Sequence, residues 1–157
     1  MVKNNKGITL ISLAVTIAVL SILITISVNS GYSSIKKVRA GRLVSYMTMV
    51  RAKSKLIYED YQFKNTSLVG TKSDLPEISE NEKSMIMNKY DISSDEFEKL
   101  NWYKWEKKDL KDQGFDENML DGEECYYINY EYGEIISSES VENFYSLTGL
   151  NKIYEQS

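Results

Sequence analysis

The sequence predicts an α+β protein in which a long N-terminal helix, transmembrane and then amphipathic, packs on a small C-terminal antiparallel sheet head. An uncharged apolar run precedes a stretch with helical spacing of apolar residues, and the last third of the chain alternates in the manner of strands. Charge divides the chain in the same way. Residues 1–58 hold nine Lys or Arg and no Asp or Glu, whereas residues 59–157 hold all 23 acidic residues and ten Lys.

The apolar run predicts a membrane-spanning helix over residues 8–30. Residues 8–28 contain no charge, Pro or Gly, and about 20 such residues span a bilayer as a helix. A soluble core helix this uniformly apolar would need a larger protein around it.

The next segment, residues 31–62, predicts an amphipathic continuation of that helix. Apolar side chains recur near the 3.6-residue period, namely Ile35, Val38, Leu43, Tyr46, Met47, Val50, Ile57 and Tyr61. We therefore expect one helix from about residue 8 to about residue 61, roughly 80 Å long at 1.5 Å per residue. Gly31 and Gly41 are either points of local bending or melting, or simply poorly filled turns.

We expect residues 63–157 to form an acidic globular head that begins with short helices. Ser79 with Glu82 and Ser93 with Glu96 have the spacing of capping boxes, each opening a helix. Residues 101–105 predict a strand or the end of the second helix. Residues 108–113 predict one helical turn that Gly114 stops.

The clearest strand signal lies near the C-terminus. Residues 125–130 alternate, so that Tyr126, Ile128 and Tyr130 share one face. A hairpin follows, with Gly133 at the position that needs positive φ and a second strand over residues 134–138. A further strand or turn is expected around residues 144–147.

The N-terminus carries a motif of its own. Lys3 and Lys6 precede Gly7, and Ile8-Thr9-Leu10-Ile11 then opens the apolar run. This arrangement resembles the type IV prepilin leader, a short basic peptide that ends in Gly before a hydrophobic helix. The resemblance implies a leader over residues 1–7, cleavage between Gly7 and Ile8, N-methylation of Ile8 and a pilin-like fold. It departs at Ser12, where the family usually has Glu.

A second resemblance covers part of the head. Pilin-like proteins of low-GC Gram-positive bacteria share a Leu-x-x-x-Gly turn, an Asp-Gly before a tyrosine-rich strand, and Asn-Tyr-x-x-Gly-Glu. Here these are residues 110–114, 121–122 and 129–134.

The missing glutamate favours a minor subunit in this family. In type IV pilins that carboxylate pairs with the N-terminal amine of a neighbour in the apolar fibre core, where an unpaired charge is costly. Ser12 cannot neutralise an amine, so this subunit fits best at the tip, as does the tip minor pseudopilin, which also lacks the glutamate. The resemblance implies four partners: other pilin subunits, a prepilin peptidase, an assembly platform protein and the membrane.

Orientation has two opposing indicators. Two lysines precede the span and four basic residues soon follow it, which alone favours a head inside the cell. The leader implies a single-pass protein with its head outside, in an extracellular filament after assembly. The alternative to a pilin is an uncleaved, single-pass membrane-anchored surface or regulatory protein.

Composition argues against several other classes. The chain has no His and a single Cys125, so neither an internal disulfide nor a zinc site of the usual kind is expected. No acid–base couple or phosphate loop stands out, so we expect no enzyme, and the short basic stretch predicts no nucleic-acid partner. No cofactor is expected. Asp116, Asp121 and Glu123 are candidate calcium ligands, with a solvated acidic surface as the alternative. The Trp and Tyr side chains of the head are expected in its core, with an adhesive surface as the alternative.

Overall fold

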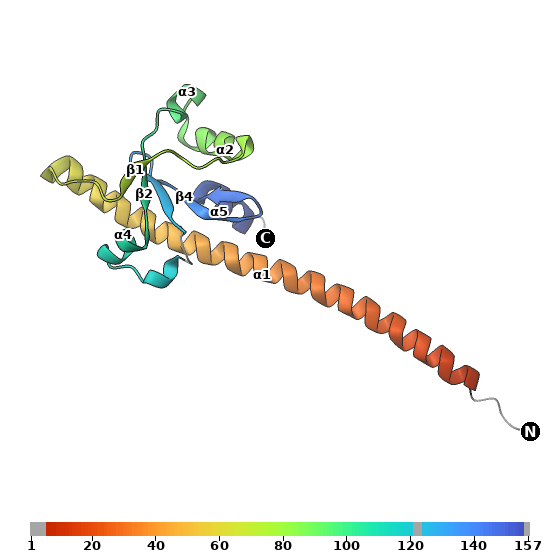
Figure 1. Ribbon diagram of the computed structural model, residues 1–157. Coiled ribbons are helices and arrows are strands. Elements are labelled where there is room, and N and C mark those ends of the chain that lie inside the picture. The colour runs from red at the N-terminus through yellow and green to blue at the C-terminus, as the bar shows by residue number, and fades with distance from the viewer. Residues whose placement is uncertain (1–5, 121–123, 156–157) are drawn as a thin grey trace, which may run out of the picture. The chain divides into compact units, whose positions relative to one another are not determined.

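The computed structural model describes residues 6–120 and 124–155, which fall into two compact units, Met1–Val38 and Arg39–Ser157. One helix, α1 (Lys6–Lys64), runs through both (Figure 1). The predicted long helix is thereby confirmed. It ends where Asn65 takes a left-handed conformation with φ of 57°, which is common just past a helix C-terminus.

The second unit is built on a five-stranded antiparallel sheet. Its strands are β1 (Thr71–Ser73), β2 (Trp102–Trp105), β3 (Tyr126–Asn129), β4 (Glu134–Val141) and β5 (Phe144–Ser146), in the order β1-β2-β3-β4-β5. The register places Tyr103 opposite Ile128 and Ile128 opposite Ile135. The α+β prediction is confirmed, and residues 102–105 form a strand rather than a helix end.

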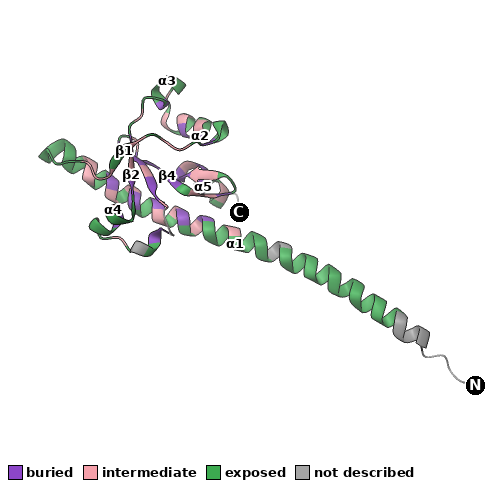
Figure 2. Ribbon diagram, viewed as in Figure 1, coloured by how far each residue is buried: buried purple, intermediate pink, exposed green. Residues whose placement is uncertain are grey.

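The described residues of this unit also form five shorter helices. They are α2 (Glu80–Tyr90), α3 (Ser94–Phe97), α4 (Lys107–Asp112), the 3-10 helix η1 (Glu117–Met119) and α5 (Leu147–Glu155). Side chains of α1, α4 and α5 join Trp105, Tyr126 and Ile128 in the main core. Figure 2 shows buried positions on the strands and on the part of α1 that lies beside them. A second cluster packs Ile86 of α2 and Phe97 of α3 against Trp102 and Ile136. The sheet is therefore covered on both faces.

The predicted turns form as expected. Gly133 has φ of 68° and its N–H donates to Asn129 O at 2.9 Å, which closes the β3–β4 hairpin. Gly114, with φ of 83°, follows α4. Between β4 and β5, Glu142 and Asn143 have φ of 54° and 65°, and two successive left-handed residues suit a tight hairpin turn.

One of the two predicted capping boxes is complete. Ser93 and Glu96 bond reciprocally at the start of α3. Ser79 accepts from the Glu82 N–H at 3.2 Å and caps α2, but the Glu82 carboxylate bonds to the β5 backbone instead of returning to Ser79. The prediction of a box at Ser79 is therefore correct for the cap and wrong for Glu82.

Candidate assembly interface

The first part of α1 presents its apolar side chains outward. Every described side chain from residue 11 to residue 28 is exposed, including Ile11 at 68% and Val28 at 62%. The helix is long and apolar enough to cross a membrane. An apolar surface of this extent is stable only against lipid or other apolar helices.

Hydroxyl groups within this segment bond to the helix itself. Thr16 donates to Ser12 O, Ser21 to Ile17 O and Thr25 to Ser21 O, each at 2.8 Å. Bonding one turn back satisfies a hydroxyl that would otherwise be costly in an apolar medium. The polar residues of the run are therefore compatible with lipid or with a fibre core.

The predicted processing residues lie at the start of this helix. Lys6 begins α1, and Gly7 and Ile8 lie in its first turn. Ser12 is exposed, one turn further on. Lys3 lies outside the described residues. The backbone is therefore regular helix from Lys6 onward.

The later part of α1 is packed against the head along one stripe. Ala40, Leu43, Met47 and Val50 are at most 3% exposed and belong to the main core. Their spacing of three or four residues places them on one helix face, and buried Ser54 continues it by donating to Arg51 O at 2.9 Å. The predicted amphipathic face is confirmed for its middle part, where Leu43, Met47 and Val50 are buried. It is wrong at its two ends, because Ile35, Val38 and Tyr61 are exposed.

Two further kinds of contact lie at the start of the packed stripe, near Ala40. Arg39 NH2 lies 2.7 Å from Glu139 Oε1 of β4, and Arg42 NH2 lies 4.0 Å from the same oxygen. A Cβ on Gly41 would lie 3.1 Å from Cε2 of Tyr154 in α5, whereas one on Gly31 would meet nothing within 4 Å. Gly41 is therefore a close-packing position, and Gly31 is not.

Two buried carboxylates, not identified from sequence, organise the start of α5. Glu82 Oε1 accepts from the N–H of Tyr145 at 2.8 Å and of Ser146 at 2.5 Å. Glu134 Oε1 accepts from the Thr148 N–H at 2.9 Å. Both side chains are at most 1% exposed, and negative charge is favourable at a helix N-terminus.

The other carboxylate oxygen of Glu134 accepts further hydrogen bonds. Glu134 Oε2 accepts from Tyr90 OH at 2.6 Å, Thr148 Oγ1 at 2.7 Å and Lys89 Nζ at 3.2 Å. Burial and the neighbouring carboxylate raise the pKa of Tyr90. Because these donors come from α2 and α5, the network ties β4 to both helices. No local sequence pattern indicated it, since its partners lie 14 to 45 residues from Glu134 along the chain.

The aromatic residues of the head are mainly core. Trp105 and Tyr126 are 0% exposed, and Trp102 and Tyr130 are 4% exposed. The Trp105 indole N–H donates to Val69 O at 3.0 Å and to Tyr130 OH at 3.1 Å, and Tyr130 OH donates to Val69 O at 2.9 Å. Burial raises the pKa of Tyr130.

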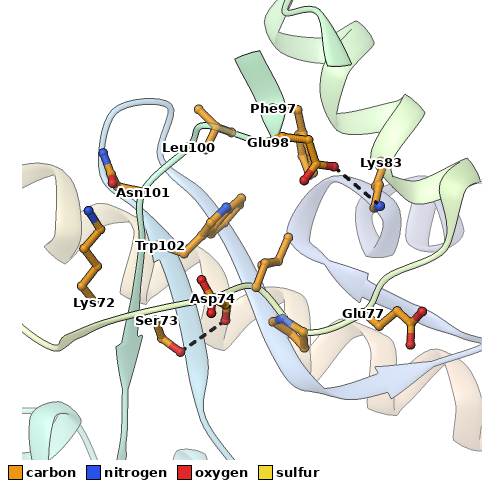
Figure 3. A pocket seen from close by; sticks show the side chains of 12 residues that line it. Lys72, Ser73, Asp74, Glu77, Lys83, Phe97, Glu98, Leu100, Asn101 and Trp102 are labelled. Atoms are coloured by element: carbon orange, nitrogen blue, oxygen red, sulfur yellow. Dashed lines mark hydrogen bonds and ion pairs between the residues drawn. The ribbon is translucent and has the colours of Figure 1, made fainter. Parts of the chain in front are cut away.

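A cleft of about 930 Å³ opens where β1 and β2 separate, between residues 72–77 and 97–102 (Figure 3). Two of its charges partly neutralise each other, because Lys83 Nζ lies 3.9 Å from Glu98 Oε1. Lys83 Nζ also lies 2.9 Å from Glu80 Oε1, which is outside the lining of the cleft. Ser73 Oγ donates to Asp74 O at 3.2 Å rather than to a base. The cleft therefore offers mixed charge beside a buried Trp102.

The candidate calcium ligands are only partly described. Asp116 is exposed and caps η1 by accepting from the Asn118 N–H at 2.8 Å. Asp121 and Glu123 lie outside the described residues. Within the described ranges, no three acidic or thiol side chains are grouped to hold a metal ion.

Comparison with known proteins places this geometry in context. The family model described as the prokaryotic N-terminal methylation motif matches residues 2–28. This is the prepilin-type cleavage and methylation segment, and it ends with the exposed apolar part of α1. No curated protein and no solved structure was found to match the chain. The N-terminal motif is thus that of prepilin-type leaders, and the long apolar helix with the antiparallel head is a pilin-like α+β architecture.

Proposed function

We propose that this chain is a structural subunit of a type IV pilus or a related secretion or competence filament, as a minor pilin or pseudopilin with the tip as its favoured position. Residues 1–7 are the leader, residues 8–30 form the membrane and fibre-core helix, residues 31–62 continue it, and residues 63–157 form the acidic head. The observation that carries this proposal is the methylation motif over residues 2–28, continuous with an exposed apolar helix.

In this function a prepilin peptidase cuts between Gly7 and Ile8, and Ile8 is then N-methylated. The apolar helix remains on the mature chain and passes from lipid into contact with other pilin subunits, helped by an assembly platform protein. Back-bonded Thr16, Ser21 and Thr25 fit both surroundings, because their hydroxyls need no outside partner. The head lies outside the cell and enters an extracellular filament.

The first experiment is intact mass and N-terminal sequencing of the protein from its native membrane or surface fraction. We expect a chain that begins at Ile8 with an N-methyl group. Substitution of Gly7 by Val should leave the leader attached, whereas Asn4→Val, three residues further from the cut in the same leader, should not. A wild-type chain that still begins at Met1 would contradict the proposal and favour an uncleaved membrane-anchored protein.

Tip placement follows from charge at position 12. A mature subunit with Ser12 has an α-amine on Ile8 and no carboxylate for the amine of a neighbour, and a tip subunit needs contacts on one side only. Ser12→Glu should therefore raise the number of copies per filament, measured by quantitative mass spectrometry of purified filaments. Ser12→Gln has similar size without charge and should not. An unchanged count in Ser12→Glu would argue against placement by charge.

A further inference from the structure

We propose that the cleft between residues 72–77 and 97–102 binds an extended peptide of another protein, which pairs with the backbone of residues 74–77 as an added strand. The preferred peptide carries Lys or Arg between apolar residues. This activity lies beyond the structural role proposed above and does not depend on it, because the cleft belongs wholly to the second unit.

The two edges of the sheet differ in how their backbone is satisfied. At the β5 edge, the buried Glu82 carboxylate accepts from the N–H groups of Tyr145 and Ser146, so these donors are closed to an incoming strand. Strand β1 forms the other edge with only three residues, and residues 74–78 follow it without helix or strand structure. Open edges of this kind are where peptides add to sheets.

The chain leaves its partner strand directly after β1. The register pairs Ser73 with Trp102, and beyond this pair the two chains separate around the cleft (Figure 3). Within residues 6–120 and 124–155, the N–H groups of Leu75 and Glu77 make no hydrogen bond. A peptide can therefore bond to these donors without displacing an existing partner.

Local sequence favours a strand-like conformation along this wall. Leu75 precedes Pro76, which biases it to extended backbone. In an extended chain alternate N–H groups point to the same side, so Leu75 and Glu77 can pair with one peptide. Pro76 lies between them and has no N–H to leave unpaired.

The cleft has the size and apolar contacts for a short peptide. Residues 74–77 span about 13 Å if extended, and a volume of about 930 Å³ lies in the range of ligand sites. Half-buried Leu75, Pro76 and Leu100 line it, and Trp102 lies between its two walls (Figure 3). Alternate apolar side chains of the peptide can pack there.

The charges of the cleft select a basic peptide. It is lined by three carboxylates, those of Asp74, Glu77 and Glu98, and by two lysines, Lys72 and Lys83. Lys83 Nζ lies 3.9 Å from Glu98 Oε1, whereas no salt bridge joins Asp74 or Glu77 to another residue that the structure describes. A Lys or Arg of the bound segment therefore meets an acidic wall, and complementary charge supplies specificity.

The test measures fluorescence anisotropy of the labelled peptide Thr-Val-Lys-Val-Lys-Val-Thr with the full chain in detergent micelles. We expect saturable binding with a Kd below about 1 mM. The same peptide with N-methyl groups on its central Val and on the Lys that follows should bind about tenfold more weakly, because a backbone donor is blocked on either edge. Hydrogen exchange at the amides of Leu75 and Glu77 should slow when the unmodified peptide is added.

Two double variants test the acidic wall. Asp74→Asn/Glu77→Gln should weaken binding by about fivefold, as expected for two partly exposed charge pairs. The matched control, Asp91→Asn/Asp95→Asn, removes two exposed charges outside the cleft and should bind as the wild type does. All four side chains are exposed, so both variants should fold.

The absence of saturable binding would overturn the proposal, as would equal affinity for the N-methylated peptide. An equal loss in the two double variants would also overturn it, because it would indicate attraction by net charge alone. If the amides of residues 74–77 became protected in the free chain as its concentration rose, the occupant would be a second copy and the proposal would be wrong.

Discussion

The apolar side chains of the two parts of α1 have opposite surroundings. From residue 11 to residue 28 every described side chain is exposed, whereas Ala40, Leu43, Met47 and Val50 are buried against the head. The first part therefore requires lipid or neighbouring helices, and the second part is stabilised within its own chain. The first part of this continuous helix can therefore change its surroundings while the later part stays packed against the head.

The largest difference between the two parts should appear in core truncation. Met47→Ala removes a fully buried side chain and should lower the free energy of unfolding of the head by about 2–5 kcal/mol. Ile24→Ala, at a position 61% exposed, should change it by less than about 0.5 kcal/mol. Tryptophan fluorescence during denaturation in detergent micelles reports the head. Equal losses in the two variants would show that the parts are not independent.

A smaller effect is expected at the network around Glu134. Glu134→Gln keeps the shape but replaces an oxygen that accepts from Tyr90, Thr148 and Lys89. The head should lose about 1–3 kcal/mol. Glu80→Gln on α2 removes the same charge from a side chain 85% exposed and should cost less than about 0.5 kcal/mol. If both variants unfold alike, the buried network does not stabilise α5.

The sequence predicted the elements whose signals are local. The apolar run, the 3.6-residue period and the capping residues Ser79 and Ser93 located α1, α2 and α3, and Gly133 located the β3–β4 turn. Strand β1 was missed because it has three polar residues and is defined only by pairing with β2. Strand β5 lies where a further strand or turn was expected, whereas helix α5, which follows directly from Leu147, was not predicted.

The candidate interface could be predicted in part for the same reason. The leader and Ser12 are read from consecutive residues. Glu82 has the position of a local capping partner, but the N–H groups of Tyr145 and Ser146, 63 and 64 residues away, take its carboxylate. Such a choice depends on the tertiary structure, because a free N–H buried at β5 would cost more than an incomplete cap at an exposed helix end.

High pH should weaken the head and spare the first part of α1. Burial raises the pKa of Tyr126, Tyr130 and Tyr90 above the usual value near 10. Below pH 10 folded and unfolded chains hold these protons equally. Above it the unfolded chain releases them first, so the free energy of unfolding falls as pH rises.

The size of that effect can be measured at one tyrosine. Tyr126 contributes at most about 1.4 kcal/mol per pH unit, and its OH makes only a 3.4 Å contact with Met119 O. Tyr126→Phe should therefore reduce the slope of unfolding free energy between pH 10 and pH 11. Tyr32→Phe, at an exposed ring in the first unit, is the control. A slope equal to that of the wild type in Tyr126→Phe would mean that this phenol titrates alike in both states.

The smallest effects separate the two glycines of α1. Alanine stabilises a helix interior by about 1 kcal/mol relative to glycine. At Gly31 nothing lies within 4 Å of the new methyl group, so Gly31→Ala should raise helix content by circular dichroism and leave unfolding of the head unchanged.

At Gly41 the methyl group must displace the Tyr154 ring, 3.1 Å away, and this ring is 55% exposed and able to move. Gly41→Ala should therefore change head stability by less than about 1 kcal/mol, and the double variant Gly41→Ala/Tyr154→Ala should recover the part lost to crowding. If Gly31→Ala changed the unfolding of the head, the stability of the helix before Val38 would be coupled to that of the head. The separate packing of the two parts predicts no such coupling.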